Sequence, residues 1–140
     1  MVAHYMLDTD TAGYIIKRSD PTLDRRVASV ALSDICISSV TRAELLYGVH
    51  RKPGAHHLAR VVTEFLATIE SLPWDDEAAD RFGMVAAELD AAGARIGTFD
   101  TMIAAHAIAT GAVIVTNNVG HFSRLATISP GFAVVDPVNV

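Results

Sequence analysis

Four short apolar runs constrain the fold of this chain more than any other feature. They are rich in residues that favour β-structure, and no polar residue interrupts them: 5–7, 35–37, 113–115 and 132–135. Strands without alternating polar residues are buried on both faces, which is typical of parallel sheets covered by helices. The runs therefore predict a central, mainly parallel sheet of four or five strands.

Segments with helical periodicity separate these runs. Apolar residues recur every three or four positions over 58–69 and again over 78–89. Two further helices are predicted from Thr41 to Val49 and from Asp100 to Thr110, the second ended by Gly111. Because strands alternate with helices, we expect an α/β fold, built as an α/β/α sandwich.

The composition is that of an ordinary globular domain, with 140 residues, 51% apolar and 19% charged. No linker, repeat or low-complexity tract interrupts it, so one domain is predicted over residues 1–140. No apolar stretch reaches the roughly 18 residues that a membrane helix needs, and the N-terminus lacks a secretion signal. We therefore expect a cytoplasmic protein that makes no membrane contact. The single cysteine, Cys36, excludes a disulfide framework and a multi-thiolate metal site within one chain.

The formal net charge of −5 conceals a difference between the two parts of the chain. Residues 1–60 carry eight basic and six acidic side chains, whereas the remainder carries three basic and ten acidic ones. The first part is therefore the one to which a polyanion can bind.

Acidic and amide side chains follow the predicted strands. Asp8 comes directly after the first strand, Glu44 lies shortly after the second, and the segment 116–118 follows the third. Asp100 opens a predicted helix. Ligands of open parallel sheets bind beyond the carboxyl ends of the strands, so we expect Asp8, Glu44 and Asp100 to converge at that edge.

Each of these acids also has a purely structural interpretation. Asp8 or Asp10 can cap a helix, Glu44 stands at capping-box spacing from Thr41, and Asp100 lies in a first helical turn that Thr98 can cap. Three carboxylates at one edge, with no Lys or Arg to pair them, repel one another unless a cation lies between them. An all-oxygen ligand set of this kind suits Mg²⁺ or Mn²⁺.

Four short motifs occur in a characteristic order and spacing over nearly the whole chain. Through them the sequence resembles the VapC-type toxins of the PIN-domain ribonuclease family, the nuclease half of toxin–antitoxin pairs. The motifs are Leu7-Asp8-Thr9; Ser39-Val40-Thr41-Arg42-Ala43-Glu44-Leu45 with Gly48; Ile96-Gly97-Thr98-Phe99-Asp100 followed by Ile103-Ala104-Ala105; and Thr116-Asn117-Asn118 with Phe122.

The resemblance implies a metal-dependent endoribonuclease that holds one or two Mg²⁺ or Mn²⁺ ions. Asp8, Glu44 and Asp100 match the three acidic ligand positions of the family. Asn118 occupies a place where many relatives have a fourth acid, and His121 stands at another such place. The hydroxyl of Thr116 is expected to orient a carboxylate or a water molecule. Arg42 and Lys17 are candidates for contact with the flanking RNA backbone.

From the expected ligands follows hydrolysis by metal-activated water, which leaves a 5′-phosphate and a 3′-hydroxyl. The resemblance further implies a homodimer, an RNA substrate such as transfer or ribosomal RNA, and a cognate VapB-like antitoxin. The antitoxin is expected to cover the groove beside Leu45, Leu46 and Val49 and to insert an Arg or Lys among the acids.

Two other functions are considered. One is a catalytically degenerate PIN-fold module that binds RNA or protein, favoured by the departures at Asn118 and His121. The other is a haloacid-dehalogenase-like phosphatase, suggested by Asp8-Thr9-Asp10, although Ala12 stands where that family has Thr or Val. Trp74 is predicted to pack at the start of the helix from Asp75 to Ala92, and stacking on a base is the alternative.

Overall fold

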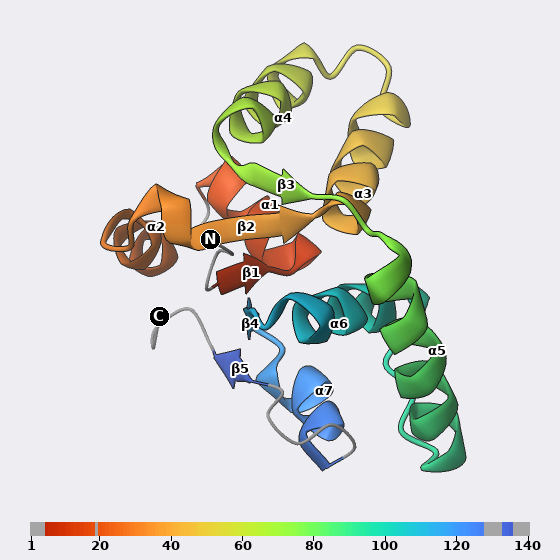
Figure 1. Cartoon of the computed structure of the whole chain (residues 1–140). Helices are drawn as coiled ribbons and strands as arrows, with labels where there is room; N and C mark the ends of the chain where they lie inside the picture. The colour runs from red at the N-terminus through yellow and green to blue at the C-terminus, as the bar shows by residue number, and fades with distance from the viewer. Residues whose placement is uncertain (1–4, 19, 128–132, 136–140) are drawn as a thin grey trace.

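A five-stranded, wholly parallel sheet forms the centre of the computed structural model, which describes residues 5–18, 20–127 and 133–135 (Figure 1). Its strand order is β3-β2-β1-β4-β5. The strands are β1 (Tyr5–Leu7), β2 (Ile35–Ser38), β3 (Glu70–Leu72), β4 (Val113–Val115) and β5 (Val134–Val135). The predicted α/β class and parallel sheet are confirmed. Phe132 of the predicted last strand lies outside the described residues.

Seven α-helices connect these strands within the described residues. They are α1 (Thr9–Lys17), α2 (Pro21–Ala28), α3 (Ser39–His50), α4 (His56–Thr68), α5 (Asp76–Ala91), α6 (Thr98–Thr110) and α7 (Val119–Phe122). Short 3-10 turns lie at Leu32–Asp34 and Ser123–Thr127. No helix in the described ranges combines the length and the apolar character that crossing a membrane requires.

Alternate residues of each strand pack on opposite faces of the sheet. Met6, Cys36 and Ile114 join a core with residues of α5, α6 and α7, whereas Leu7 and Val115 join a second core. Side chains of α1, α2 and α4 close the second core. The sheet is therefore the middle layer of an α/β/α sandwich, in which every strand residue of β2 is buried.

The local sequence corrects two predicted helix starts. Helix α3 begins at Ser39 rather than Thr41, because the hydroxyl of Ser38 accepts a hydrogen bond from the Val40 N–H and caps the helix. Thr41 is therefore inside the helix, and the capping-box interpretation of Glu44 is wrong. Helix α6 begins at Thr98, so Thr98 is not its cap.

The sheet order reverses direction at β1. The chain passes outward from β1 through β2 to β3, then returns to place β4 on the other side of β1. At such a switch point the loops on either side diverge and leave a crevice at the carboxyl ends of the strands. Asp8 follows β1 and Thr116 follows β4, so the topology brings both to this crevice.

Candidate metal-binding active site

Asp8 forms the centre of the crevice. Its Oδ1 accepts a hydrogen bond of 2.9 Å from the Thr11 N–H and so caps α1, while its Oδ2 accepts one of 2.6 Å from the Thr116 hydroxyl. The side chain is 3% exposed. Burial raises the pKa of Asp8, and the hydrogen bonds from Thr11 and Thr116 offset part of that rise. Asp8 is thus both a helix cap and a member of the acidic cluster.

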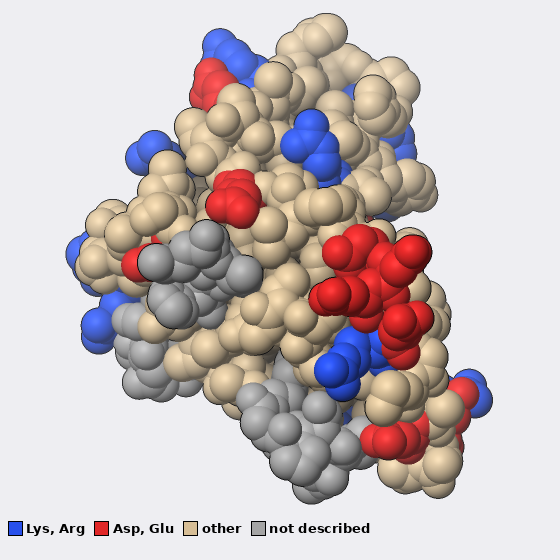
Figure 2. Space-filling view, viewed as in Figure 1, with Lys and Arg blue, Asp and Glu red and all other residues tan. Residues whose placement is uncertain are grey.

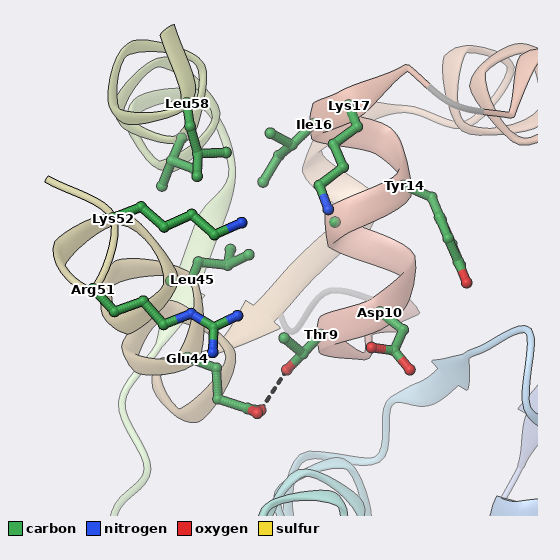
Figure 3. Close-up of a pocket in the computed structure, with 13 residues that line it drawn as sticks. Thr9, Asp10, Tyr14, Ile16, Lys17, Glu44, Leu45, Arg51, Lys52 and Leu58 are labelled. Atoms are coloured by element: carbon green, nitrogen blue, oxygen red, sulfur yellow. Dashed lines mark hydrogen bonds between the residues drawn. The ribbon is translucent and has the colours of Figure 1, made fainter. Parts of the chain in front are cut away.

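Glu44 approaches the same crevice from α3. Its Oε1 accepts a hydrogen bond of 2.6 Å from the Thr9 hydroxyl (Figure 3). The Thr9 hydroxyl also lies 3.1 Å from the Thr41 hydroxyl. Burial raises the pKa of Glu44, the Thr9 hydrogen bond lowers it, and the charges of Asp10 and Asp8 raise it further. The carboxylate is therefore held in place by a residue of α1.

Asp100 completes the cluster from the first turn of α6. Burial raises its pKa to about 6; the nearby His121 opposes the rise, and the charges of Asp8, Glu44 and Asp10 add to it. His121 Nε2 lies 3.5 Å from Asp100 Oδ2 and donates a hydrogen bond of 2.6 Å to the Ile96 carbonyl oxygen. The structure therefore places His121 against one of the predicted ligands.

The remaining predicted residues lie in different surroundings. Asn118 is exposed, and its backbone N–H donates to the Thr116 hydroxyl at 2.9 Å. Lys17 lines a cavity together with Thr9 and Glu44, whereas Arg42 is exposed on α3. Residues two positions apart on a helix do not face the same way, so Arg42 and Glu44 point in different directions.

The cavity beside Glu44 contains the predicted Lys17 and two further cations, Arg51 and Lys52. It has a volume of about 420 Å³ between α1, α3 and α4, and Lys17, Arg51 and Lys52 reach into it (Figure 3). Their proximity to Glu44 was detectable only in part, because Gly48 and Arg51 follow Glu44 at helical spacing. Lys17 was singled out, but its pairing with Arg51 and Lys52 depends on how two helices pack.

The cluster fits a hard divalent cation by its chemistry. Asp8, Glu44 and Asp100 offer only carboxylate oxygens; Asp8 is close enough to raise the pKa of Glu44, and both are close enough to raise the pKa of Asp100. Over the described ranges, no three His, Cys, Asp or Glu side chains already stand as ligands around one point. Like charges repel one another, and a cation among the three carboxylates would offset that repulsion.

Comparisons with known proteins agree with this geometry. The model of the PIN domain family matches residues 5–128. The chain is 37% identical over 132 residues to the tRNA(fMet)-specific endonuclease VapC of Salmonella typhimurium, covering 94% of this chain and 96% of that protein. It is 34% identical over 122 residues to Ribonuclease VapC2 of Rickettsia felis, covering 86% and 91%. The chain belongs to the PIN domain family.

Within that family its relatives are VapC proteins. A crystal structure of DNA-bound VapBC from Salmonella typhimurium superimposes with a TM-score of 0.87 at 36% identity, over 97% of this chain and 99% of that one. The fold and the resemblance predicted from the sequence are confirmed. The phosphatase alternative has no support in these relatives.

Proposed function

We propose that this chain is a VapC-type endoribonuclease toxin whose acidic cluster hydrolyses RNA phosphodiester bonds. One observation carries the proposal: Asp8 after β1, Glu44 on α3 and Asp100 on α6 lie close enough that the charge of Asp8 raises the pKa of Glu44 and both charges raise the pKa of Asp100. The relationship to ribonucleases over nearly the full chain supports it.

Asp8, Glu44 and Asp100 would hold Mg²⁺ or Mn²⁺, with the Asn118 amide oxygen as a fourth ligand. When bound, such an ion lowers the pKa of a water molecule and stabilises negative charge on the phosphoryl oxygens. Thr116 and Thr9 keep the Asp8 and Glu44 carboxylates oriented through hydrogen bonds of 2.6 Å each. These hydrogen bonds already orient the two carboxylates, so binding of a metal ion would require little rearrangement of the backbone.

The bond changes follow from water as the nucleophile. A water oxygen bonds to phosphorus, the bond from phosphorus to the ribose 3′ oxygen breaks, and that oxygen takes a proton. The products therefore carry a 5′-phosphate and a 3′-hydroxyl, and the 2′-hydroxyl takes no part. Lys17, which lines the adjoining cavity, is better placed than Arg42 to contact the flanking phosphate.

The proposed partners are an RNA, such as transfer or ribosomal RNA, and a cognate VapB-like antitoxin in the cytoplasm. The structural relatives from Salmonella and Rickettsia are VapBC complexes, which supports an antitoxin partner. We propose that the antitoxin places a cationic side chain among the acids, because these carboxylates have no Lys or Arg partner among the described residues. A homodimer is proposed from the family resemblance alone.

The test is cleavage of a panel of structured RNAs by the purified protein with Mg²⁺, Mn²⁺ or EDTA. We expect cleavage that requires metal and is lost in Asp100→Asn, with a folded protein by circular dichroism. Asp80→Asn, an exposed acid on α5, is the matched control and should cleave normally. Digestion by an exonuclease specific for 5′-phosphates identifies the product ends.

A protein free of antitoxin that binds RNA but cuts nothing with any metal would contradict the proposal. That outcome would favour the degenerate binding module, with Asn118 in place of an acid as its physical basis.

A further inference from the structure

Two exposed aromatic side chains flank the mouth of the acidic cluster. Tyr47 on α3 is 66% exposed and Phe99 on α6 is 56% exposed. Both line one cavity of about 700 Å³, which Thr9, Ala43, Glu44, Gly48 and Arg51 complete. Exposed large apolar side chains are unfavourable in water, and two of them at the edge of a candidate active site point to a binding role.

Each aromatic residue is tied to a carboxylate by its position in the sequence. Tyr47 follows Glu44 by three residues on α3, and Phe99 directly precedes Asp100 on α6. Glu44, Tyr47, Gly48 and Arg51 are spaced as i, i+3, i+4 and i+7, so they form one stripe along the helix and its C-terminal cap. Of the three carboxylates, Glu44 lines the same cavity as the two rings.

Arg51 joins this aromatic cavity to the cationic one beside it. Its guanidinium carbon lies 5.5 Å from the centre of the Tyr47 ring, and it also lines the cavity that contains Lys17 and Lys52 (Figure 3). Neither lysine forms a salt bridge within the part of the chain that the structure describes. The surface thus offers rings for stacking and, next to them, cations for phosphate.

Gly48 lines both cavities and places no side chain in either of them. A glycine inside a helix costs roughly 0.5–1 kcal/mol relative to alanine. A Cβ added to Gly48 would meet nothing within 4 Å, so packing against the rest of the protein does not require a glycine there. Its effect is to leave space within the two cavities, next to Glu44.

We propose that Tyr47 and Phe99 stack on unpaired nucleobases next to the scissile phosphate, and that Arg51 holds the neighbouring phosphate of the same strand. The inference rests on the proposed ribonuclease function and adds to it the side chains that bind the bases and the neighbouring phosphate of an unpaired strand. Unpaired bases stack on aromatic side chains whatever their sequence. The cavity is of the size that single ligand groups occupy in proteins.

The lining favours RNA over a protein occupant. The lining of this cavity is mostly apolar, which suits a nucleobase as well as a partner helix, but Arg51 and the lysines of the adjoining cavity add the cations that a phosphate needs. A nucleotide strand matches both features, because its bases are flat and its phosphates need cations. A second copy of the chain or an antitoxin on the same rings is the competing outcome of the test.

The experiment measures binding of a short fluorescent single-stranded RNA to full-length Asp100→Asn protein by anisotropy, with an abasic strand of the same length alongside. In this background, Tyr47→Ala and Phe99→Ala should each weaken binding by at least about fivefold, since stacking contributes roughly 1–3 kcal/mol per base. Affinity for the abasic strand should be unchanged. Phe99→Trp and Tyr47→Phe should retain binding, whereas Phe99→Leu should not.

Met84→Ala is the matched control, because Met84 on α5 is 58% exposed and lies outside both cavities. Unchanged affinity in Tyr47→Ala and Phe99→Ala would overturn the inference, as would full recovery by leucine, which indicates apolar contact without stacking. Light scattering adds a further test. A loss of dimer in either alanine variant would assign the rings to contact between copies and overturn the proposal.

Failure of this inference is distinguishable from failure of the proposed function. Wild-type protein that cleaves RNA while the aromatic variants bind normally would refute only the stacking. Absence of metal-dependent cleavage, with binding that still depends on the rings, would refute only the nuclease.

Discussion

Asp8 shows how one side chain takes part in both structure and site. One of its oxygens caps α1 through the Thr11 N–H and the other accepts the Thr116 hydroxyl. The structural interpretation of Asp8 from the sequence was therefore right, and the cap does not exclude a ligand role. A carboxylate fixed at both oxygens is already oriented before anything binds to it.

The Thr116 hydroxyl gives a sharp test of this orientation. Thr116→Val keeps the shape of the side chain but removes the 2.6 Å hydrogen bond to Asp8 and the acceptor for the Asn118 N–H. We expect about 1–3 kcal/mol loss in the free energy of unfolding, because buried polar groups lose a partner. Cleavage at neutral pH should fall at least tenfold, as when a residue that orients a metal ligand is lost. Thr116→Ser should retain both.

The raised pKa of Asp100 makes stability depend on pH. A carboxyl whose folded pKa of about 6 exceeds its ordinary value of 3.8 stabilises the fold fully below pH 3.8, and that contribution is lost as the pH rises through 6. Asp100→Asn should therefore be more stable than wild type at pH 7.5 without metal, by about 1 kcal/mol after allowance for solvent screening.

Urea denaturation at pH 4.5 and pH 7.5 checks this expectation. The two proteins should differ much less at the lower pH. Mg²⁺ or Mn²⁺ at pH 7.5 should stabilise wild type more than Asp100→Asn, since a bound ion favours the ionised cluster. A variant less stable than wild type at pH 7.5 would show that the ionised Asp100 carboxylate does not destabilise the folded protein, and would contradict the prediction.

Among the secondary-structure elements, α3 and its C-terminal cap contribute Glu44, Gly48 and Arg51 to both cavities. The N-terminal cap of α3, Ser38, is also hydrogen-bonded at 2.8 Å to the buried His106 of α6, so the start of α3 is linked to the middle of α6. Glu44 and Asp100 come from these two helices. The contact between Ser38 and His106 joins residues 68 positions apart and has no signal in the sequence.

Gly48 provides the prediction that belongs to α3. Gly48→Ala should raise the free energy of unfolding by about 0.5–1 kcal/mol, because alanine has the better helix propensity and its methyl group meets nothing. Binding of single-stranded RNA should weaken as the methyl group enters both cavities. Gly83→Ala on α5 should gain stability in the same way and leave RNA binding unchanged. Equal RNA affinity in both variants would contradict the role given to Gly48.

The elements that sequence reasoning found are the ones with uninterrupted patterns. The three runs that became β1, β2 and β4 are wholly apolar because both faces of the central strands are buried. Strand β3 was missed because Glu70 and Ser71 face less buried surroundings at the edge of the sheet. Helices α1 and α2 were missed because they are short and mostly half-buried or exposed.

The acidic residues were predictable and the side chains around them were not. Asp8, Glu44 and Asp100 follow strand ends or open helices, which are positions that a sequence pattern locates. Tyr47, Phe99 and Arg51 have no such signal, because only the packing of α3 against its neighbours decides which side chains stay exposed. The exposure of an aromatic residue is a property of tertiary structure.

Across the full chain, charge is distributed by region. Acidic side chains gather over the start of α5, where Asp76 and Glu77 lie in the first turn, and Lys and Arg are spread over the part that contains α2 and α4 (Figure 2). The cationic cavity lies among α1, α3 and α4, in the first half of the sequence. The three cations of this cavity come from the first part of the chain, where the sequence predicts that a polyanion binds, and that binding stays a prediction.

The lysines of this cavity should set the salt dependence of RNA binding. Lys17→Gln and Lys52→Gln should each reduce the slope of log affinity against log salt by about 0.7, the value for one phosphate contact on a single strand. The measurement is anisotropy over a range of salt concentrations. Arg26→Gln, at the end of α2 and outside the cavity, should leave the slope unchanged. Slopes equal to wild type in both lysine variants would place the phosphates elsewhere.

The reaction of the Cys36 thiol with a reagent reports how often the folded protein opens. Cys36 lies fully buried at the centre of β2, and burial raises the pKa of its thiol to about 12. A thiol reagent can therefore react only with molecules in which the sheet has separated. Labelling rates should fall when a ligand binds the folded state, whether that ligand is a metal ion, RNA or an antitoxin. The labelling rate of Cys36 can therefore be used to compare the affinities of metal ions, RNA and antitoxin without an engineered label and without a cleavage assay.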